Sequence, residues 1–344
     1  RLFKKSFQSN KASSCNKLKM VSLEGQNNTN GFEHIKFKYA GKKWDAHVHL
    51  YRLEDTAELI SYAAEYKVEK FTAIVRDDWH IYEEAFPGQF VFARFIINQN
   101  VFNGHLQKVL DDLQAIADAG YPFVKLWYSP RWRRFVEEHF QANVEGFRLD
   151  APALDPLFQK IEELNLGLLL HIADPDLFYR LKYQPESYYG SKTQHLKELE
   201  NILNKHPEMK IQVAHMAGQP EHLDHLAQWL DKYPQLYVDT SSAKWMAREF
   251  SYNPEVARQF FLDYQDRILF GTDIVTGRTD REPIPGYYYL RYLSLQALLE
   301  TDIQEFPLPL DDPENNNETI INGLDLPLKV LRKIYWENSK QFYS

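Results

Sequence analysis

Short apolar segments alternate with amphipathic segments along most of this chain. Eight segments rich in β-branched or aromatic residues predict β-strands, and they lie at 44–49, 70–76, 90–96, 123–127, 167–171, 210–215, 236–240 and 268–273. Several are apolar throughout, which is typical of strands buried on both faces of a parallel sheet. The segments between them carry apolar stripes at helical spacing, such as Val109, Leu113 and Ile116, which predict helices with one buried face.

Eight strands that alternate with helices predict an α/β fold of the (β/α)8 TIM-barrel class, because right-handed crossovers make such strands parallel and eight of them close a barrel. An open, doubly wound sheet is the alternative, but the sequence lacks the glycine-rich phosphate loop that would favour it. Long loops are expected after strands 4, 5 and 8, at 128–153, 172–192 and 274–324. In a barrel these loops would border the face that carries the active site.

Electrical charge divides the chain into two parts. The first 43 residues hold ten Lys or Arg against two Glu, a net charge of +8, which leaves −16 on the other 301 residues. The stretch up to about Asn30 is rich in Ser and Asn and has no hydrophobic periodicity. We therefore predict a basic, partly flexible tail at 1–43 and a single barrel domain at 44–344. The acidic domain argues against a nucleic-acid partner, because phosphate binding needs a basic surface.

The composition also bears on the compartment. No run of ~18 apolar residues is present, so we expect no membrane-spanning segment. The single cysteine, Cys15, cannot form a disulfide within the chain, so stability has to come from packing. We expect a cytoplasmic protein that acts on a small molecule. Whether it forms a homo-oligomer does not follow from the sequence. The missing initiator Met indicates a trimmed chain, which leaves an exported or lipid-anchored form as an alternative.

The strongest local signal is the segment Trp44-Asp45-Ala46-His47-Val48-His49. Alternate residues of a strand share a face, so Asp45, His47 and His49 are expected to point the same way. Two imidazoles at one strand end can bind a first-row metal ion, and the Asp45 carboxylate could orient one of them by a hydrogen bond. Exposed or hydrogen-bonded core histidines would explain the same residues, so this segment alone does not establish a metal site.

Four further strands carry residues that can bind a metal ion. Strand five ends at His171, strand six at His215 and strand eight at Asp273, and Lys125 lies within the apolar fourth strand. A lysine in such a strand is costly unless it is paired, bound to metal or modified. Each residue alone can be a hydrogen-bonded core residue. The carboxyl ends of parallel strands meet at one end of a barrel, however, so five such strands favour a shared site.

Together these residues resemble the amidohydrolase superfamily, with Asp-x-His-x-His on strand one, Lys on strand four, His on strands five and six, and Asp on strand eight. Within it the chain is most similar to the amidohydrolase-related branch of TIM-barrel metal-dependent hydrolases. Four segments add to the likeness, at 213–218, 237–241, 270–273 and 334–339. The resemblance covers residues 44–344, is specific for the superfamily, and says little about the substrate.

The resemblance implies a divalent metal ion, most often zinc, held by His47, His49, His171 and Asp273 with a water molecule at the open position. It implies that Asp273 takes the proton of this water and returns it to the leaving group. His215 would polarise the substrate carbonyl or stabilise the developing oxyanion.

Lys125 bears on the number of metal ions. In binuclear members of the superfamily the strand-four lysine is carboxylated and bridges two ions. By this resemblance, the ligands of a second ion would be Lys125, His171 and His215. We favour one ion, as in many members of the branch that this chain resembles. The simpler alternative for Lys125 is an unmodified amine paired with a carboxylate such as Asp239 or Asp273.

The leading functional prediction is metal-dependent hydrolysis of a C–N or C–O bond (amide, cyclic amide, lactone or ester) in a small polar molecule. Non-oxidative decarboxylation of an aromatic or unsaturated carboxylic acid, a reaction of the same branch, is the alternative, and a barrel that binds a ligand without catalysis is a third. Arginine and tyrosine suit a substrate carboxylate and ring. The candidate substrate-binding residues are Arg76, Arg94, Trp127, Tyr128, Arg131 and Tyr288.

Overall fold

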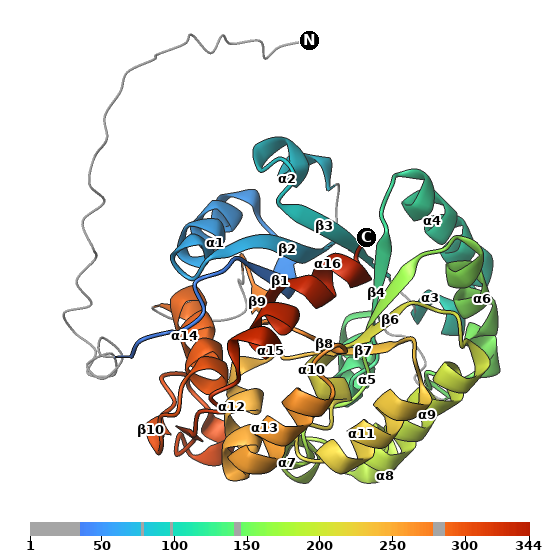
Figure 1. The fold of residues 1–344 in the computed structure, drawn as a ribbon. Helices are drawn as coiled ribbons and strands as arrows, with labels where there is room; N and C mark the ends of the chain where they lie inside the picture. The colour runs from blue at the N-terminus through green and yellow to red at the C-terminus, as the bar shows by residue number, and fades with distance from the viewer. Residues whose placement is uncertain (1–34, 77–78, 97–98, 141–145, 278–285) are drawn as a thin grey trace, which may run out of the picture. The chain divides into compact units, whose positions relative to one another are not determined.

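A sheet of parallel strands forms the centre of the structure (Figure 1). The computed structural model describes residues 35–76, 79–96, 99–140, 146–277 and 286–344. The strands of this sheet are β1 (Lys43–Leu50), β2 (Val68–Val75), β3 (Phe90–Phe95), β4 (Phe123–Trp127), β5 (Gly167–His171), β6 (Ile211–Val213), β7 (Leu236–Asp239), β8 (Ile268–Leu269) and β9 (Ile274–Val275). Their order is β8-β7-β6-β5-β4-β3-β2-β1-β9, which confirms the predicted succession of parallel strands.

The two ends of this sheet are parts of one strand. β8 pairs with β7 and β9 pairs with β1, and only residues 270–273 separate β8 from β9 in the chain. Backbone hydrogen bonds from Ala46 N to Phe270 O (2.7 Å) and from Asp273 N to His47 O (2.8 Å) join β1 to this intervening segment. The eighth strand thus contacts both neighbours, and the sheet closes as the predicted (β/α)8 TIM barrel.

Helices connect the strands and surround the sheet (Figure 1). The crossovers contain α1 (Leu53–Glu65), α2 (His80–Ala85), α3 (Gln99–Phe102), α4 (Leu106–Asp118), α6 (Asp155–Glu163), α9 (Lys192–Lys205), α11 (Leu223–Lys232), α12 (Ala243–Tyr252) and α13 (Pro254–Asp263). The predicted stripe on α4 is buried at Val109, Leu113 and Ile116, as expected for a helix that packs on a sheet. Within the described ranges, no helix has the length and hydropathy that a bilayer span requires.

The three long connections contain secondary structure of their own. After β4 come α5 (Pro130–Phe140) and a 3₁₀ turn at Pro152–Leu154, and after β5 come α7 (Asp176–Leu181) and α8 (Glu186–Tyr189). After β9 come α14 (Tyr287–Glu300) and the hairpin of β10 (Phe306–Pro307) and β11 (Ile320–Ile321). Each connection leaves from the carboxyl end of a strand, which is the end where barrel enzymes place their active sites.

The C-terminal segment closes the opposite end of the barrel. α15 (Leu328–Arg332), a π-helical turn at Lys333–Glu337 and α16 (Asn338–Phe342) follow β11, and Figure 1 shows α16 across this end. Tyr343 stacks on Trp44 of β1 at 5.4 Å between ring centroids, and Phe342 lies 5.6 Å from Phe123 of β4. These rings join the apolar interior of the barrel. Because the amino-terminal ends of the strands are filled in this way, the carboxyl ends are left for a binding site.

Part of the segment that the sequence assigned to the tail lies against the barrel. Residues 35–42 belong to the same unit as residues 43–344, and Lys43 is the first residue of β1. Tyr39 N donates to Glu300 Oε2 of α14 (2.9 Å), and Lys43 Nζ lies 3.7 Å from Glu300 Oε1. The buried carboxylate therefore joins the chain before β1 to α14. Residues 1–34, including Cys15, lie outside the described residues.

His195 on α9 makes the stability of the fold sensitive to acid. The imidazole is 4% exposed, and its Nδ1 accepts a hydrogen bond from Tyr179 OH (2.8 Å). Burial lowers the pKa of His195 to about 4, so the unfolded chain binds this proton first as the pH falls. The contribution of neutral His195 to the free energy of unfolding is complete above pH ~6.5. It should be lost between pH ~6.5 and ~4, at a cost of up to ~3 kcal/mol.

Urea unfolding of a His195→Gln variant at pH 7.5 and at pH 4.5 measures this contribution. Glutamine does not titrate, so the difference in unfolding free energy between the two pH values should be smaller in the variant than in the parent protein. His105→Gln is the matched control, because His105 is exposed. An equal pH dependence in His195→Gln and the parent protein would contradict the prediction.

Candidate metal centre

Three of the predicted metal ligands meet at the carboxyl ends of β1 and the eighth strand. His47 and His49 lie on β1, and Asp273 directly precedes β9. The two histidine Nε2 atoms are 3.3 Å apart, and Asp273 Oδ1 lies 3.6 Å from His47 Nε2 and 3.3 Å from His49 Nε2. His47 is buried, whereas the side chains of His49 and Asp273 are 14% and 27% exposed. The three donor atoms therefore gather where solvent reaches the barrel mouth.

The separations of these three atoms fit a metal ion. Ligand atoms at ~2.0–2.1 Å from a tetrahedral zinc ion lie ~3.3 Å from one another, close to the values found here. Burial lowers the pKa of His49 to about 4, which keeps this imidazole in the neutral form that binds metals. Three protein ligands are also the number found in catalytic zinc sites, where the fourth position is left for water or substrate.

Asp239, the last residue of β7, orients His47. Its Oδ2 lies 3.1 Å from His47 Nδ1 and accepts a hydrogen bond from Gln212 Nε2 (2.6 Å), while Oδ1 accepts from the backbone N–H groups of His215 (3.0 Å) and Ser241 (3.1 Å). Burial opposes ionisation of Asp239, but the contacts with His47 hold the pKa of the carboxyl below its usual value. The ionised carboxylate accepts the Nδ1 proton of His47, which leaves the Nε2 lone pair directed at the candidate centre.

Asp45 does not have the orienting role that its position in the sequence predicts. The pairing of β1 with β2 shifts register between Asp45 and Val48, a β-bulge that breaks the alternation of side chains. The Asp45 carboxylate instead accepts hydrogen bonds from Thr272 Oγ1 (2.6 Å) and Tyr292 OH of α14 (2.9 Å). Burial raises its pKa to about 7, although these hydrogen bonds partly offset the shift. Asp45 Oδ1 also accepts from the backbone N–H of His47 (3.2 Å), so Asp45 holds the backbone of β1, whereas Asp239 contacts the His47 ring.

The backbone at Asp273 is held in an unusual conformation. Its φ angle is 55°, in the left-handed region that non-glycine residues rarely adopt. Asp273 N donates to His47 O (2.8 Å), and Arg291 Nη1 of α14 donates to the carbonyls of Thr272 (2.8 Å) and Asp273 (3.2 Å). These bonds aim the carboxylate at the two histidines, and backbone strain of this kind is concentrated at functional sites.

His215 lies just beyond β6 and is held by Ser241. The predicted strand 210–215 ends at Val213, because His215 takes a left-handed φ of 59° in the short turn α10 (Ala214–Ala217). Ser241 Oγ donates to the Asp239 carboxylate and lies 2.8 Å from His215 Nδ1. The hydroxyl has one proton to donate, so its oxygen accepts the Nδ1 proton of His215. The Nε2 atom of His215 is therefore left with a lone pair.

His171, at the end of β5, has a carboxylate partner of its own. Its Nε2 atom lies 2.7 Å from Asp174 Oδ1, and Tyr183 OH donates to Asp174 Oδ2. Burial opposes ionisation of Asp174, but its contacts with His171 and Tyr183 hold its pKa below the usual value. The His171 ring is 4.4 Å from the His215 ring and stands beside the group of three donor atoms without belonging to it.

Lys125 of β4 is buried and has an unpaired amine. It is 2% exposed, and its Nζ atom has no hydrogen-bond partner among the described residues. Burial lowers its pKa to about 8, although the charges of Asp239 and Asp273 act in the opposite direction. Within the described ranges neither carboxylate forms an ion pair with Nζ, so these two charges act on Lys125 from a distance. The amine is thus a polar group that the described contacts leave unexplained.

A second group that could hold a metal ion lies elsewhere, at Asp176, Glu221 and His222. Lys192 Nζ pairs with both carboxylates of this group, at 2.8 Å from Asp176 Oδ1 and more closely with Glu221. Its ammonium already balances the charge that a cation would neutralise. His222 is also 47% exposed and hydrogen-bonded to Asp176, so this group is a surface ion-pair network.

The sequence matches the amidohydrolase family over residues 131–344, more than half of the chain. The chain belongs to the amidohydrolase family. This match confirms the predicted resemblance, and the family is one whose members generally depend on a metal ion. None of the curated proteins matches the sequence.

Solved structures similar to this chain share its fold. One is 5-carboxyvanillate decarboxylase LigW from Sphingomonas paucimobilis, with a TM-score of 0.51 and 9% sequence identity over 88% of this chain and 98% of that chain. Another is the uncharacterized TIM-barrel protein Bb4693 from Bordetella bronchiseptica, with a TM-score of 0.52 and 13% identity over 88% of this chain and 98% of that chain. At these identities the likeness establishes the TIM-barrel fold.

Two of the predicted substrate-binding residues lie near the candidate centre. The Arg76 guanidinium lies 4.9 Å from the centroid of the Tyr51 ring, which in turn is 6.2 Å from the His49 ring. Trp127 of β4 lies 6.4 Å from the His171 ring. Trp127 therefore contacts a predicted ligand directly, whereas the Tyr51 ring separates Arg76 from His49.

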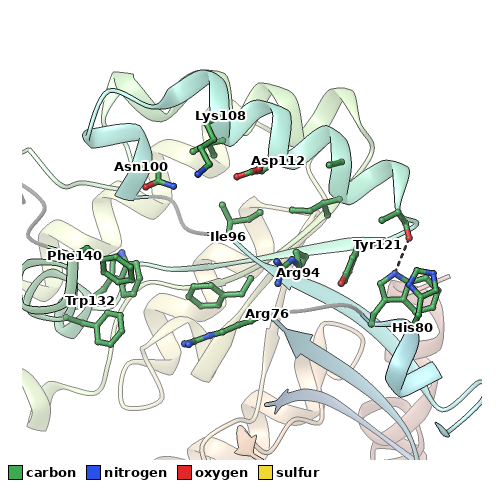
Figure 2. A pocket seen from close by; sticks show the side chains of 17 residues that line it. Arg76, His80, Arg94, Ile96, Asn100, Lys108, Asp112, Tyr121, Trp132 and Phe140 are labelled. Carbon is green, nitrogen blue, oxygen red and sulfur yellow. Dashed lines mark hydrogen bonds between the residues drawn. The ribbon is translucent and has the colours of Figure 1, made fainter. Parts of the chain in front are cut away.

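The other four lie in different surroundings. Arg94 lines a groove beside β3 (Figure 2), and Arg131 is exposed on α5. Tyr128 is buried and stacks on Phe147, with ring centroids 4.9 Å apart. Tyr288 is buried and lies against Tyr62 of α1 at 6.3 Å. The tertiary structure thus uses both tyrosines to pack elements together.

Besides Asp239, which the sequence suggested only as a partner of Lys125, three residues at the centre were not predicted as functional from the sequence. Asp174 and Ser241 hold His171 and His215, and Arg291 holds the backbone of Asp273. Asp174 lies three residues after His171, and Ser241 lies two residues after Asp239. Their closeness to the ends of predicted strands is the sequence feature that could have indicated their role. Arg291 lies 18 residues beyond Asp273 in the chain, and no local pattern marks it.

Proposed function

We propose that this amidohydrolase is a metal-dependent hydrolase that cleaves a C–N or C–O bond in a small polar molecule, such as an amide, cyclic amide, lactone or ester. The observation that carries the proposal is the group of His47, His49 and Asp273, whose donor atoms have the separations of a zinc site. Imidazole nitrogen and carboxylate oxygen are ligands of catalytic zinc, which makes zinc the proposed ion.

Asp273 is the proposed proton carrier. When bound, the metal ion supplies the Lewis-acid chemistry that makes a water molecule nucleophilic near neutral pH. Burial opposes ionisation of Asp273, but its contacts with His49 and His47 hold its pKa well below the usual value. An ionised carboxylate that solvent reaches can accept the proton of the attacking water and return it to the leaving group.

His215 is proposed to accept rather than donate. Its Nδ1 proton is engaged with Ser241, and burial lowers its pKa to about 3, so the ring is neutral. Donation to a substrate carbonyl from Nε2 would require a second proton on this ring. An Nε2 lone pair suits acceptance of a hydrogen bond or proton from the substrate or from water.

We propose that one ion is bound. A second ion would need both His171 and His215 as ligands, but Asp174 engages Nε2 of His171 and so leaves only the Nε2 lone pair of His215. Lys125 would also have to carry a carboxylate. An amine whose pKa lies near 8 is partly neutral at physiological pH, and only the neutral amine can be carboxylated. Carboxylation of Lys125 is therefore chemically feasible, and the two-ion arrangement is the alternative.

Metal analysis tests the centre directly. The purified protein, incubated with zinc and then dialysed, is expected to retain about one zinc per chain, and a His47→Ala variant fewer than ~0.2. His105→Ala, at an exposed histidine, is the control and should retain as much zinc as the parent protein. A zinc content below ~0.2 per chain in the parent protein would overturn the proposed function.

Arg76 favours decarboxylation as the second candidate function. Its guanidinium stands one aromatic ring away from His49, where it could hold the carboxylate of an aromatic or unsaturated acid. Carbon dioxide release, measured over a panel of lactones, cyclic amides and aromatic acids, separates the two reactions. Turnover of a lactone or amide without carbon dioxide supports hydrolysis, whereas carbon dioxide from an aromatic acid alone supports the second candidate.

A further inference from the structure

A series of hydrogen bonds runs through the barrel interior, from the segment that closes its amino-terminal end to the candidate metal centre. Tyr343, just after α16, donates its hydroxyl proton to Gln212 Oε1 of β6. Gln212 Nε2 donates to Asp239 Oδ2 (2.6 Å), and this oxygen lies 3.1 Å from His47 Nδ1. Three hydrogen bonds in series therefore join the Tyr343 hydroxyl to the His47 ring.

The proton of each bond in this series follows from the donors and acceptors that are present. The ionised Asp239 carboxylate can only accept, so the Gln212 atom that faces it at 2.6 Å has to be the NH₂ nitrogen. The second proton of this NH₂ group is directed at Ala46 O (3.1 Å). Gln212 Oε1 then faces Tyr343 and needs a donor. The hydroxyl is closer to Gln212 Oε1 than to Ala46 O (3.2 Å), so its single proton goes to Gln212.

The Tyr343 hydroxyl fixes the direction in which the Gln212 amide points. If the amide were turned by half a rotation, its oxygen would face the ionised Asp239 carboxylate, and two acceptors would stand against each other. Gln212 and Asp239 are both 0% exposed, so solvent does not offer replacement hydrogen bonds. The proton from Tyr343 therefore favours the orientation in which Asp239 receives an N–H group.

Ring packing holds Tyr343 in place independently of its hydroxyl. The ring stacks on Trp44 of β1, with centroids 5.4 Å apart and an interplanar angle of 19°. It also meets the Phe123 ring edge to face at 5.0 Å. Aromatic contacts of this kind stabilise the closed end of the barrel through the ring alone. Removal of the hydroxyl should therefore leave this packing intact.

We propose that Tyr343 is a positioning residue of the metal centre. Its hydroxyl orients the Gln212 amide, and the oriented amide holds the Asp239 carboxylate at the place from which it directs His47 Nε2 at the ion. Tyr343 acts through these two residues and not by contact with the ion. The effect on metal binding rests on the proposed function, whereas the orientation of the His47 ring is a property of the metal-free protein.

Zinc affinity, measured by competition with a fluorescent chelator, tests this role. Tyr343→Phe keeps the ring and should weaken zinc binding by ~3–10-fold, less than the ~10–100-fold typical of a residue that contacts a ligand directly. Tyr335→Phe is the matched control, because Tyr335 is also buried in the C-terminal segment and its hydroxyl donates to Glu300 Oε1 (2.9 Å), outside the series. Its zinc affinity should stay within twofold of the parent protein. A change within twofold in Tyr343→Phe, or an equal loss in Tyr335→Phe, would overturn the proposal.

A double-mutant cycle separates action through Gln212 from a general loss of stability. Gln212→Met removes both ends of the amide at similar volume and should itself weaken zinc binding. In this background Tyr343→Phe should cause less than a twofold further loss, because the series is already broken. Losses that multiply in the double variant would show that Tyr343 does not act through Gln212, and would overturn the proposal.

Nitrogen NMR of the zinc-free protein reports on the His47 ring without the ion. In the parent protein Nδ1 should carry the proton, which separates the shifts of the two ring nitrogens. In Tyr343→Phe the two shifts should move toward each other as the Nε2-protonated tautomer gains population, and in Tyr335→Phe they should not. Unchanged His47 shifts in Tyr343→Phe would overturn the proposal. A parent protein with these shifts that retains no zinc would contradict the proposed function instead, so the two failures are told apart.

Discussion

Replacing Asp273 with asparagine is expected to lower kcat/KM by at least ~10³-fold on the substrate identified from the panel. An amide cannot accept the proton of the attacking water, and it is a weaker metal ligand than a carboxylate. The hydrogen bonds that hold this position, from Asp273 N to His47 O and from Arg291 to Asp273 O, involve the backbone and remain in the variant. The fold should therefore be retained, as circular dichroism and the unfolding midpoint would show.

Metal content has to be measured in the same samples, because Asp273 is both a proposed ligand and the proposed proton carrier. Asp266→Asn is the matched control, since the Asp266 carboxylate is 67% exposed and paired with Lys333 on the surface. Turnover of Asp273→Asn within tenfold of the parent enzyme, at equal zinc content, would rule out Asp273 as the proton carrier.

Replacing Asp239 with asparagine is expected to weaken zinc binding by ~10–100-fold, although Asp239 is not among the proposed ligands. Its carboxylate accepts hydrogen bonds from several donors at once, including the His47 ring, Gln212 and Ser241. The asparagine side chain would place an NH₂ group where one carboxylate oxygen accepts hydrogen bonds. At least one of the buried donors would therefore lose its acceptor. We also expect the free energy of unfolding to fall by ~3 kcal/mol, the scale of a buried hydrogen bond to a charged group.

Competition with a fluorescent zinc chelator measures the affinity, and urea unfolding measures the stability. Ser241→Ala is the milder companion variant, because it removes one donor to Asp239 and the acceptor of the His215 Nδ1 proton and leaves the carboxylate in place. Asp231→Asn, at an exposed position on α11, is the control. Zinc affinity in Asp239→Asn within twofold of the parent protein would show that Asp239 does not orient His47.

The strands of the barrel were predictable because each is a short apolar run with a helical segment on either side. The predicted ranges for β4 and β5 match the structure, and those for β1 and β2 differ by one or two residues at each end. The prediction failed at the ends of strands six and eight. There, His215 and Asp273 take left-handed backbone conformations, which the apolar pattern of a strand does not encode.

The candidate ligands were predictable for a different reason. In a parallel barrel every strand delivers its carboxyl end to the same mouth, so His47, His49 and Asp273 had to be neighbours once the fold was known. The structure brings the donor atoms of these three residues within 3.6 Å of one another, so they form one group, and His171 lies beside this group. That division depends on Asp174, whose carboxylate holds the His171 ring through a contact made after the strand has ended.

The amino-acid sequence by itself determined the barrel, the family and the residue types at the strand ends, because all three follow from local apolar pattern and from short motifs. Only the tertiary structure decided which carboxylate orients His47. A one-residue bulge in β1 turns Asp45 toward α14, and β7, nearly two hundred residues later, supplies Asp239 in its place. The groove beside β3 was likewise decided by packing, since its walls come from α2, α4 and α5. Contacts between segments so far apart are set by how the crossovers pack, which a local pattern does not specify.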